Sequence, residues 1–470
     1  MLIMVMNLME MEKASDYFNP VNFTRFYDEK LKRKKGGGLD GLTPATFWKH
    51  YSKELDDIAS RCLNGTYKFS AYKEKLILKG RDKFPRVLSL PSMRDRLILG
   101  VLNQYLQKAF PEAVNNLVPN QYVNDISDFL AHHSLEKIYF FKTDITGFYD
   151  AIDLNTLYRK LKPYIDVNVL QLIKTAINTI TVSNGGMRLV SNQQPRLMGI
   201  PQGLSISNIL SGISMLDFDE SIESYCDDNT LYKRYVDDIL ILSTNPIDAR
   251  FVDEFKCELI IRGVSLRLSP NKTHYGIVGE KNFEYIGYNF ISSLCISIRQ
   301  KNTRIFLNRI SRLISRYRSQ KDNPFLRPRF ISDDNAFDEY YIALINLKLS
   351  GFKTCNHLYG WLPYFQAMTD IHLLYELDAV VHKKFLKDLE IEKKIKHLPK
   401  VYWDIKKHAG KNLLTDFDVL TETGDIKAYL ISKGLIDSTF DYSEDEIRTR
   451  YFVHLEHLKK DAHMTIGTTS

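Results

Sequence analysis

Short apolar runs separated by polar turns dominate the middle of the chain and predict paired strands. Residues 138–145 form one such run and end by presenting a single carboxylate, Asp144. Residues 232–234 and 239–242 have the aromatic and β-branched bias of two further strands, with Asp237 and Asp238 at the turn between them. The pattern therefore predicts that two buried strand edges deliver aspartates to the same region.

Helical periodicity appears on both sides of these strands. After two alternating segments, residues 72–83 and 86–91, which predict a hairpin turning at Gly80, a helix is expected from Ser92. A second helical stretch begins at Lys301, with one apolar stripe and one basic face. The apolar stripe consists of Phe306, Ile310, Leu313, Ile314 and Tyr317, and the basic face of Arg309, Arg312 and Arg316.

Composition limits the classes of protein that fit. The 470 residues are 44% hydrophobic and 12% aromatic, which suits a folded chain with more than one domain. With 64 basic and 57 acidic residues the net charge is only +7, so any nucleic-acid contact depends on local clusters. The five cysteines are scattered singly, which predicts neither a disulfide framework nor a structural zinc site. No run is long enough to span a bilayer, so a cytoplasmic protein without a membrane partner is expected.

The Asp237-Asp238 pair has two readings. Aspartate is common in solvated turns, and this pair alone would not distinguish a turn from a site. A buried carboxylate pair, however, is costly unless cations neutralise it. Together with Asp144 it has the donors to hold two divalent ions about 4 Å apart for phosphoryl transfer. Hard oxygen ligands favour Mg²⁺, with Mn²⁺ as an alternative.

Residues 199–208, Gly-Ile-Pro-Gln-Gly-Leu-Ser-Ile-Ser-Asn, stand between Asp144 and the Tyr235-Val236-Asp237-Asp238 motif. In this order and spacing the three segments resemble those of reverse transcriptases. The resemblance implies an α+β, right-hand polymerase with fingers, a palm with an antiparallel sheet, a helical thumb and a C-terminal α-helical region. The expected parts are an N-terminal extension (1–70), fingers and palm (71–299), a thumb (300–368) and the helical region (369–470).

The same resemblance assigns roles around the metals. Asp144, Asp237 and Asp238, with the main-chain oxygen of Ile145, would be the metal ligands, and Lys272 would protonate the departing pyrophosphate. Tyr149 aligns with the aromatic steric gate that excludes a ribose 2′ hydroxyl, although a core aromatic beside Phe148 is the alternative.

Further residues are expected to contact the nucleotide or the duplex. Gln202 would hydrogen-bond near the nucleotide, and Gly203 would allow close backbone approach. Basic side chains of the fingers would grip the triphosphate, unless they are surface charges; the candidates are Lys83, Arg86 and Arg94. Arg309, Arg312 and Arg316 would hold the duplex, the alternative being a solvated helix face.

The lineage is harder to assign from the residues. The chain resembles bacterial reverse transcriptases of the group II intron and retron lineage. The string at residues 201–208, together with Gly360-Trp361-Leu362-Pro363-Tyr364 ahead of a helical tail, looks most like the defence-associated group that includes abortive-infection enzymes. The expected partners are a cognate non-coding RNA template, the DNA product and deoxynucleoside triphosphates, in antiviral defence. An intron maturase or a catalytically silent nucleic-acid-binding scaffold is the alternative, and template, primer and oligomeric state stay open.

Overall fold

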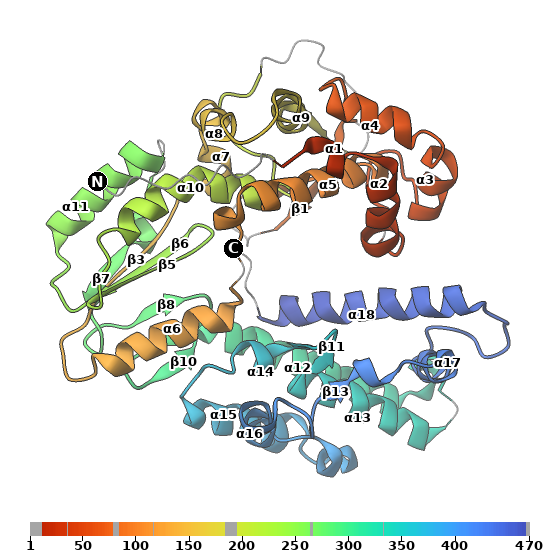
Figure 1. Cartoon of the computed structure of the whole chain (residues 1–470). Coiled ribbons are helices and arrows are strands. Elements are labelled where there is room, and N and C mark those ends of the chain that lie inside the picture. The colour runs from red at the N-terminus through yellow and green to blue at the C-terminus, as the bar shows by residue number, and fades with distance from the viewer. Residues whose placement is uncertain are drawn as a thin grey trace. The chain divides into compact units, whose positions relative to one another are not determined.

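The chain folds into two compact units, each assembled from separate stretches of sequence. The computed structural model describes residues 12–34, 36–78, 84–115, 117–183, 195–263, 267–331 and 333–466. The first unit comprises Met1–Asn116, Thr143–Ile239 and Ile247–Thr273; the second comprises Leu117–Lys142, Leu240–Pro246 and His274–Ser470. Both contain helices and strands, which confirms the α+β class (Figure 1). Because the units interleave along the sequence, the boundaries expected at residues 70, 299 and 368 stay predictions.

The first unit opens with helices around the predicted hairpin. These elements are α1 (Ala14–Tyr17), α2 (Pro20–Phe26), η1 (Tyr27–Leu31), α3 (Pro44–Tyr51), α4 (Leu55–Leu63), α5 (Met93–Ala109) and η2 (Pro111–Ala113). Helix α5 begins where Ser92 accepts a hydrogen bond from the N–H of Asp95, at 3.2 Å. Its expected apolar face, which includes Leu97 and Tyr105, is fully buried. The predicted helix after Ser92 is therefore confirmed.

A three-stranded sheet in the order β2-β1-β4 contains the hairpin. Strands β1 (Tyr72–Ile77) and β2 (Arg86–Leu90) pair antiparallel, with Lys75 opposite Leu88. Strand β4 (Thr181–Val182) joins β1 in parallel. The predicted turn at Gly80 lies outside the described residues, but the two strands flanking it are confirmed.

A four-stranded sheet carries the strands that present the aspartates. Its order is β5-β6-β3-β7, with β3 (Tyr139–Asp144), β5 (Thr230–Tyr235), β6 (Asp238–Ser243) and β7 (His274–Ile277). Buried side chains at Phe140 and Phe141 and along 239–242 explain why these segments form its central strands. The neighbouring helices are α7 (Phe148–Ala151), α8 (Leu154–Leu161), α9 (Val167–Asn178), α10 (Ser207–Glu223), α11 (Ala249–Glu258), η3 (Leu259–Gly263) and η4 (Pro270–Lys272).

The second unit contains α6 (Pro119–His132) and a sheet in the order β10-β9-β8. Its strands are β8 (Phe283–Tyr285), β9 (Tyr288–Phe290) and β10 (Ile296–Ile298). Ile286 and Gly287 join β8 to β9 with φ angles of 47° and 86°. A two-residue β-hairpin with a type I′ turn requires positive φ angles at both turn residues.

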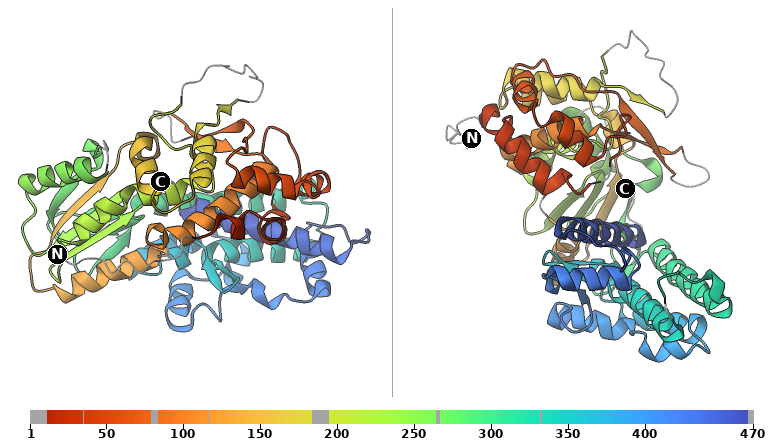
Figure 2. Two further views of the ribbon diagram at one scale, coloured as in Figure 1. Left: turned by 45° about the horizontal axis from the view of Figure 1, so that its top comes forward. Right: turned by 90° about the vertical axis from the view of Figure 1, so that its right-hand side faces the viewer.

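The rest of the second unit is mainly helical, as the cyan to blue segments of Figure 2 show. Its elements are α12 (Gln300–Asp322), η5 (Pro324–Leu326), α13 (Asp334–Ser350), β11 (Phe352–Thr354), β12 (His357–Tyr359), α14 (Trp361–Tyr364), α15 (Ile371–Ala379), η6 (Val380–Phe385), η7 (Glu390–Lys394), α16 (Leu398–His408), β13 (Thr415–Asp416), η8 (Phe417–Val419), α17 (Thr423–Ser432) and α18 (Glu444–Ile466). A cluster around Phe352, Phe417, Leu430 and Tyr451 forms a local core. None of the described helices combines the length and apolar character needed to cross a membrane.

Candidate active site

The turn between β5 and β6 places Asp237 beside the end of β3. Val236 adopts the left-handed conformation, with φ of 61°, and so reverses the chain within the predicted motif. The N–H of Ile145 donates to the carbonyl oxygen of Asp237 at 3.0 Å. Asp144 and Asp237 thus stand on neighbouring segments of the first unit, as the two strand patterns predicted, and Asp238 begins β6.

Electrostatics show that the two carboxylates act on one another. Burial raises the pKa of Asp237, and the charge of Asp144 raises it further. The positive charges of Lys272 and Arg86 oppose this shift. A partly desolvated pair of like charges next to two cations is the electrostatic setting expected of a metal site.

Lys272 contacts Asp144 although the two residues are 128 positions apart in the sequence. Its Nζ lies 2.5 Å from Oδ2 of Asp144, and the side chain is 55% exposed. The N–H of Ser269 donates to the carbonyl oxygen of Asp144 at 2.7 Å, which anchors η4 beside β3. An exposed ammonium held at this carboxylate could also meet an incoming phosphate.

The sequence did not reveal that Arg234 and Asp219 brace the turn. The Arg234 guanidinium pairs with the carboxylate of Asp219 on α10, with Nε 2.7 Å from Oδ1. Its NH1 donates to the carbonyl oxygen of Val236 at 2.9 Å. The position of Arg234 directly before the motif was a weak signal, whereas no local pattern marked Asp219. The bidentate pair limits movement of the turn that carries Asp237.

Tyr149 lies on α7, just beyond the end of β3, and faces the same region. Its hydroxyl donates to Oδ1 of Asn208 on α10 at 2.7 Å. Burial raises the pKa of Tyr149, and the charge of Asp237 raises it further, while Arg86 lowers it. The ring therefore lies within electrostatic range of the carboxylates. Its role as a steric gate stays a prediction.

The loop containing Gln202 and Gly203 packs on the end of β2. The carbonyl oxygen of Gln202 accepts a hydrogen bond from the N–H of Ser89 at 2.7 Å. Gly203 has a φ of 100°, and an added Cβ would lie 3.0 Å from the carbonyl oxygen of Ser89. A glycine is therefore needed at position 203 so that the loop can pack closely against β2. The sequence predicts instead that this glycine allows close approach to a nucleotide.

The structure does not treat the three residues predicted to contact the triphosphate alike: one lies near the candidate site, one contacts other residues and one is not described. Arg86, at the start of β2, acts electrostatically on both Asp237 and Tyr149, and its buried Nε makes no hydrogen bond within the parts of the chain that the structure describes. Arg94 is engaged elsewhere: it donates to the carbonyl oxygen of Lys68 at 3.3 Å and lies 5.3 Å from the centroid of the Tyr67 ring. Lys83 lies outside the described residues. Arg86 is consequently the strongest of the three candidates.

The arginines of α12 do not share one environment. Arg312 and Arg316 are exposed, as a binding face requires. Arg309 instead pairs with Asp461 of α18, with NH1 2.7 Å from Oδ1, and Asp461 also pairs with Lys348. The expected set of three is therefore divided into two exposed cations and one that joins α12 to α18.

Comparison with known proteins identifies the class. Residues 77–290 match the family model described as reverse transcriptase (RNA-dependent DNA polymerase), a range that includes Asp144, Asp237, Asp238 and Lys272. The chain thus carries a reverse transcriptase domain. This domain is the one found in RNA-directed DNA polymerases, which are nucleotidyltransferases, and the mixed helix and sheet architecture agrees with it. No curated protein sequence matches the chain.

Solved structures similar to the chain include three of yeast telomerase. Apo telomerase from Candida tropicalis is 13% identical over 85% of this chain and 66% of that chain, with a TM-score of 0.42. The same enzyme truncated from its C-terminal domain is 17% identical over 49% and 55%, with a TM-score of 0.36. Telomerase from Candida albicans in complex with a fragment of telomeric RNA is 14% identical over 91% and 69%, with a TM-score of 0.38. The chain spans 55–69% of the length of these proteins.

Proposed function

We propose that this enzyme copies a partner RNA into DNA by two-metal nucleotidyl transfer and thereby limits phage infection in the bacterial cytoplasm. The observation that carries the chemical part is the convergence of Asp144 and Asp237, partly buried, with Lys272 and Arg86 acting on them. A primer 3′ hydroxyl and an α-phosphate would react beside these carboxylates.

The donor set fits magnesium. Asp144 and Asp237 supply carboxylate oxygens, Asp238 is the next residue, and the carbonyl oxygen of Ile145 is adjacent. Burial and the charge of Asp144 both raise the pKa of Asp237, as expected for a half-buried carboxylate pair that a cation would stabilise. When bound, Mg²⁺ would neutralise the carboxylates and stabilise charge on the reacting phosphate.

The chain's own side chains would position the nucleotide and complete proton transfer. Arg86 has a buried guanidinium nitrogen without a hydrogen bond, suited to a phosphate oxygen. Lys272, exposed at Asp144, would give a proton to the departing pyrophosphate. Tyr149 would exclude the ribose 2′ hydroxyl, and Gln202 would contact the nucleotide.

Nucleic-acid binding would use the exposed arginines of α12. We expect the double variant Arg312→Gln/Arg316→Gln to weaken primer–template affinity and reduce its salt slope by up to about 2, since each lost phosphate contact releases roughly one counterion fewer. Affinity measured between low and moderate salt checks this. Arg309→Gln is the matched control: it loses the bond to Asp461 and should alter the slope less. An unchanged slope in the double variant would mean that Arg312 and Arg316 are only a solvated face.

The defence role is supported by the intact carboxylate set and by the similarity of the tail to the abortive-infection group. The test is to sequence DNA recovered from cells expressing the chain and to measure phage plating. DNA mapping to one small RNA, and protection from phage, should both disappear in Asp237→Asn/Asp238→Asn and persist in Asp253→Asn, which changes an exposed aspartate of α11. Protection that survives the double variant would favour a silent scaffold, and splicing of a flanking intron would favour a maturase.

A further inference from the structure

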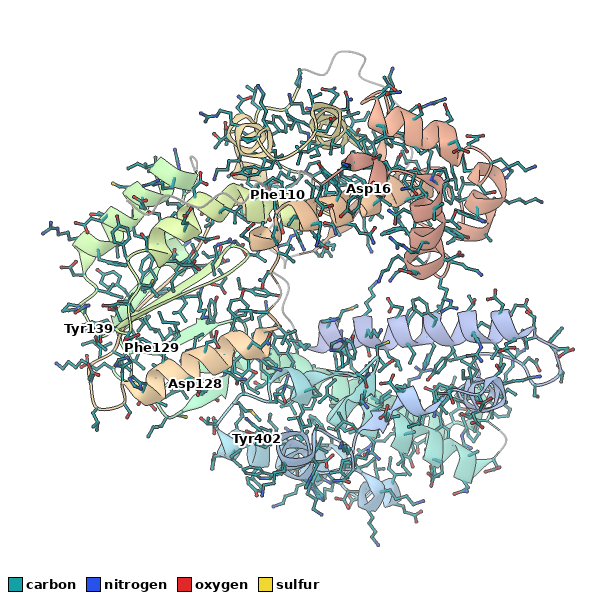
Figure 3. All side chains as sticks on the ribbon, viewed as in Figure 1. Asp16, Phe110, Asp128, Phe129, Tyr139 and Tyr402 are labelled. Atoms are coloured by element: carbon teal, nitrogen blue, oxygen red, sulfur yellow. The ribbon has the colours of Figure 1, made fainter. Side chains whose placement is uncertain are left out.

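Two histidines and an aspartate that have no part in the candidate active site meet within the C-terminal helical region. Asp378 lies near the end of α15, His382 in η6, and His397 immediately before α16. One potential ligand atom from each lies within 4.8 Å of the others, and no other group of three such side chains among the described residues does so. Figure 3 shows these helices with Tyr402 of α16 labelled. These three side chains are close enough together to bind one metal ion.

The surroundings of His382 favour metal binding through its Nε2 atom. Its side chain is only 6% exposed, and its Nδ1 lies 2.6 Å from Oε1 of Glu392, to which a protonated Nδ1 donates. In the neutral ring the lone pair then resides on Nε2. This buried Nε2 makes no hydrogen bond to any described residue; it lies 3.7 Å from Oδ1 of Asp378, beyond hydrogen-bond range. A carboxylate that orients a histidine through its far nitrogen is the usual support of a metal-binding imidazole.

The other two groups are held in position around that nitrogen. Oδ1 of Asp378 accepts the N–H of Leu398 at 2.8 Å, and its Oδ2 lies 2.8 Å from Nδ1 of His397. The rings of His382 and His397 stack with centroids 4.0 Å apart. Residues 380–385 form a π-helical turn, a conformation that is rare in proteins and frequent at functional sites. Asp378 is 15% exposed and His397 is 44% exposed, so the cluster is buried on one side and open to water on the other.

We propose that this cluster binds one zinc ion through Nε2 of His382, the carboxylate of Asp378 and a ring nitrogen of His397, with water as the fourth ligand. Two imidazoles and one carboxylate with an open position form a ligand set that zinc accepts. Zinc–ligand bonds of about 2 Å place tetrahedral ligands a little over 3 Å apart, so the 3.7 Å separation of His382 Nε2 and Asp378 Oδ1 needs only a small closure. The half-exposed ring of His397, now stacked on His382, would turn to bring its nitrogen to the ion. The all-oxygen set around Asp237 suits magnesium instead, and the two sites therefore select different ions.

The ion would tie α15 and η6 to α16. In the sequence, η7 separates α15 and η6 from α16. The cysteines of the chain do not have zinc-ligand spacing. A ligand that binds only the folded state raises thermal stability according to its concentration relative to its Kd. At a hundred-fold excess over Kd the melting temperature of the 470-residue chain should rise by about 3 °C.

The test uses the full-length, untagged protein after treatment with a chelator, titrated with ZnCl₂ in a calorimeter. We expect one ion per chain, and the rise in melting temperature should accompany it. His382→Gln and the more exposed His397→Gln should each weaken binding by at least about 100-fold. Glu392→Gln, which alters only the orienting bond, should weaken it by about 10-fold. His372→Gln, an 84% exposed histidine of α15, is the matched control and should bind like the wild type.

Two results would overturn the proposal. The first is the absence of stoichiometric zinc binding by the wild type, which would make the cluster a network of ion pairs that caps α16. The second is binding that persists in His397→Gln or that is lost in Asp237→Asn, since either would place the ion elsewhere. His397→Gln keeps the test decisive if His382→Gln fails to fold, and circular dichroism identifies that case.

Discussion

Asp237→Asn is expected to lower magnesium-dependent nucleotide incorporation by more than about 100-fold, because even the outer partners of metal ligands contribute roughly 10–100-fold. The same change should leave the melting temperature equal or higher. Burial and the charge of Asp144 raise the pKa of Asp237, so its ionised form costs stability in the fold. That cost appears as pH rises from the ordinary aspartate pKa through the folded value and is absent below both. The gain in melting temperature should therefore be seen at neutral pH and vanish in acid.

Single-nucleotide extension assays and melting curves recorded with a chelator separate these two effects. Asp253→Asn serves as the control, since it alters an exposed carboxylate that pairs only with Lys256 three residues away. An Asp237→Asn protein that is folded and fully active would exclude Asp237 as a metal ligand. A loss of activity accompanied by a large fall in melting temperature would instead point to a structural role.

Tyr149→Ala is expected to raise the use of ribonucleotides relative to deoxynucleotides by about tenfold or more, the range in which a pocket discriminates by shape. The ring lies on α7, in the segment that follows β3, and is within electrostatic range of Asp237. We expect the sugar of a nucleotide bound at these carboxylates to lie beside the ring. Removal of the ring would therefore free space for a 2′ hydroxyl. Ratios of kcat/KM for matched ribo- and deoxynucleotides measure the effect.

Tyr149→Phe provides the matched control for that experiment. It keeps the ring but loses the hydroxyl that donates to Asn208. A steric gate should survive this change, with discrimination close to the wild type. If Phe relaxes discrimination as much as Ala does, the bond to Asn208 is what matters; if neither variant changes it, Tyr149 is a packing residue.

Local patterns predicted the elements that carry the site. The apolar runs at 138–145 and 239–242 form the expected central strands because alternating or continuous apolar residues determine which face of a sheet is buried. The helix after Ser92 was predictable from a cap and a periodic apolar face. The cysteine pattern, in contrast, gave no indication of the cluster at His382, because its ligands are two histidines and an aspartate without a motif spacing.

What the sequence by itself indicated is the reverse transcriptase domain, because the resemblance depends on the order of three short segments, and the family model matches the same part of the chain. It also named the candidate carboxylates, whose catalytic role stays a prediction. The resemblance placed Lys272 at the site, but only the tertiary structure showed its contact with Asp144, 128 positions away, and the pair that Asp219 forms with Arg234 beside the turn. The tertiary structure also separated Arg309 from Arg312 and Arg316, although the three share one helical face in the sequence pattern. The physical reason is that a local pattern specifies which side chains are buried, whereas the partner of a buried or half-buried charge is chosen by packing between distant segments.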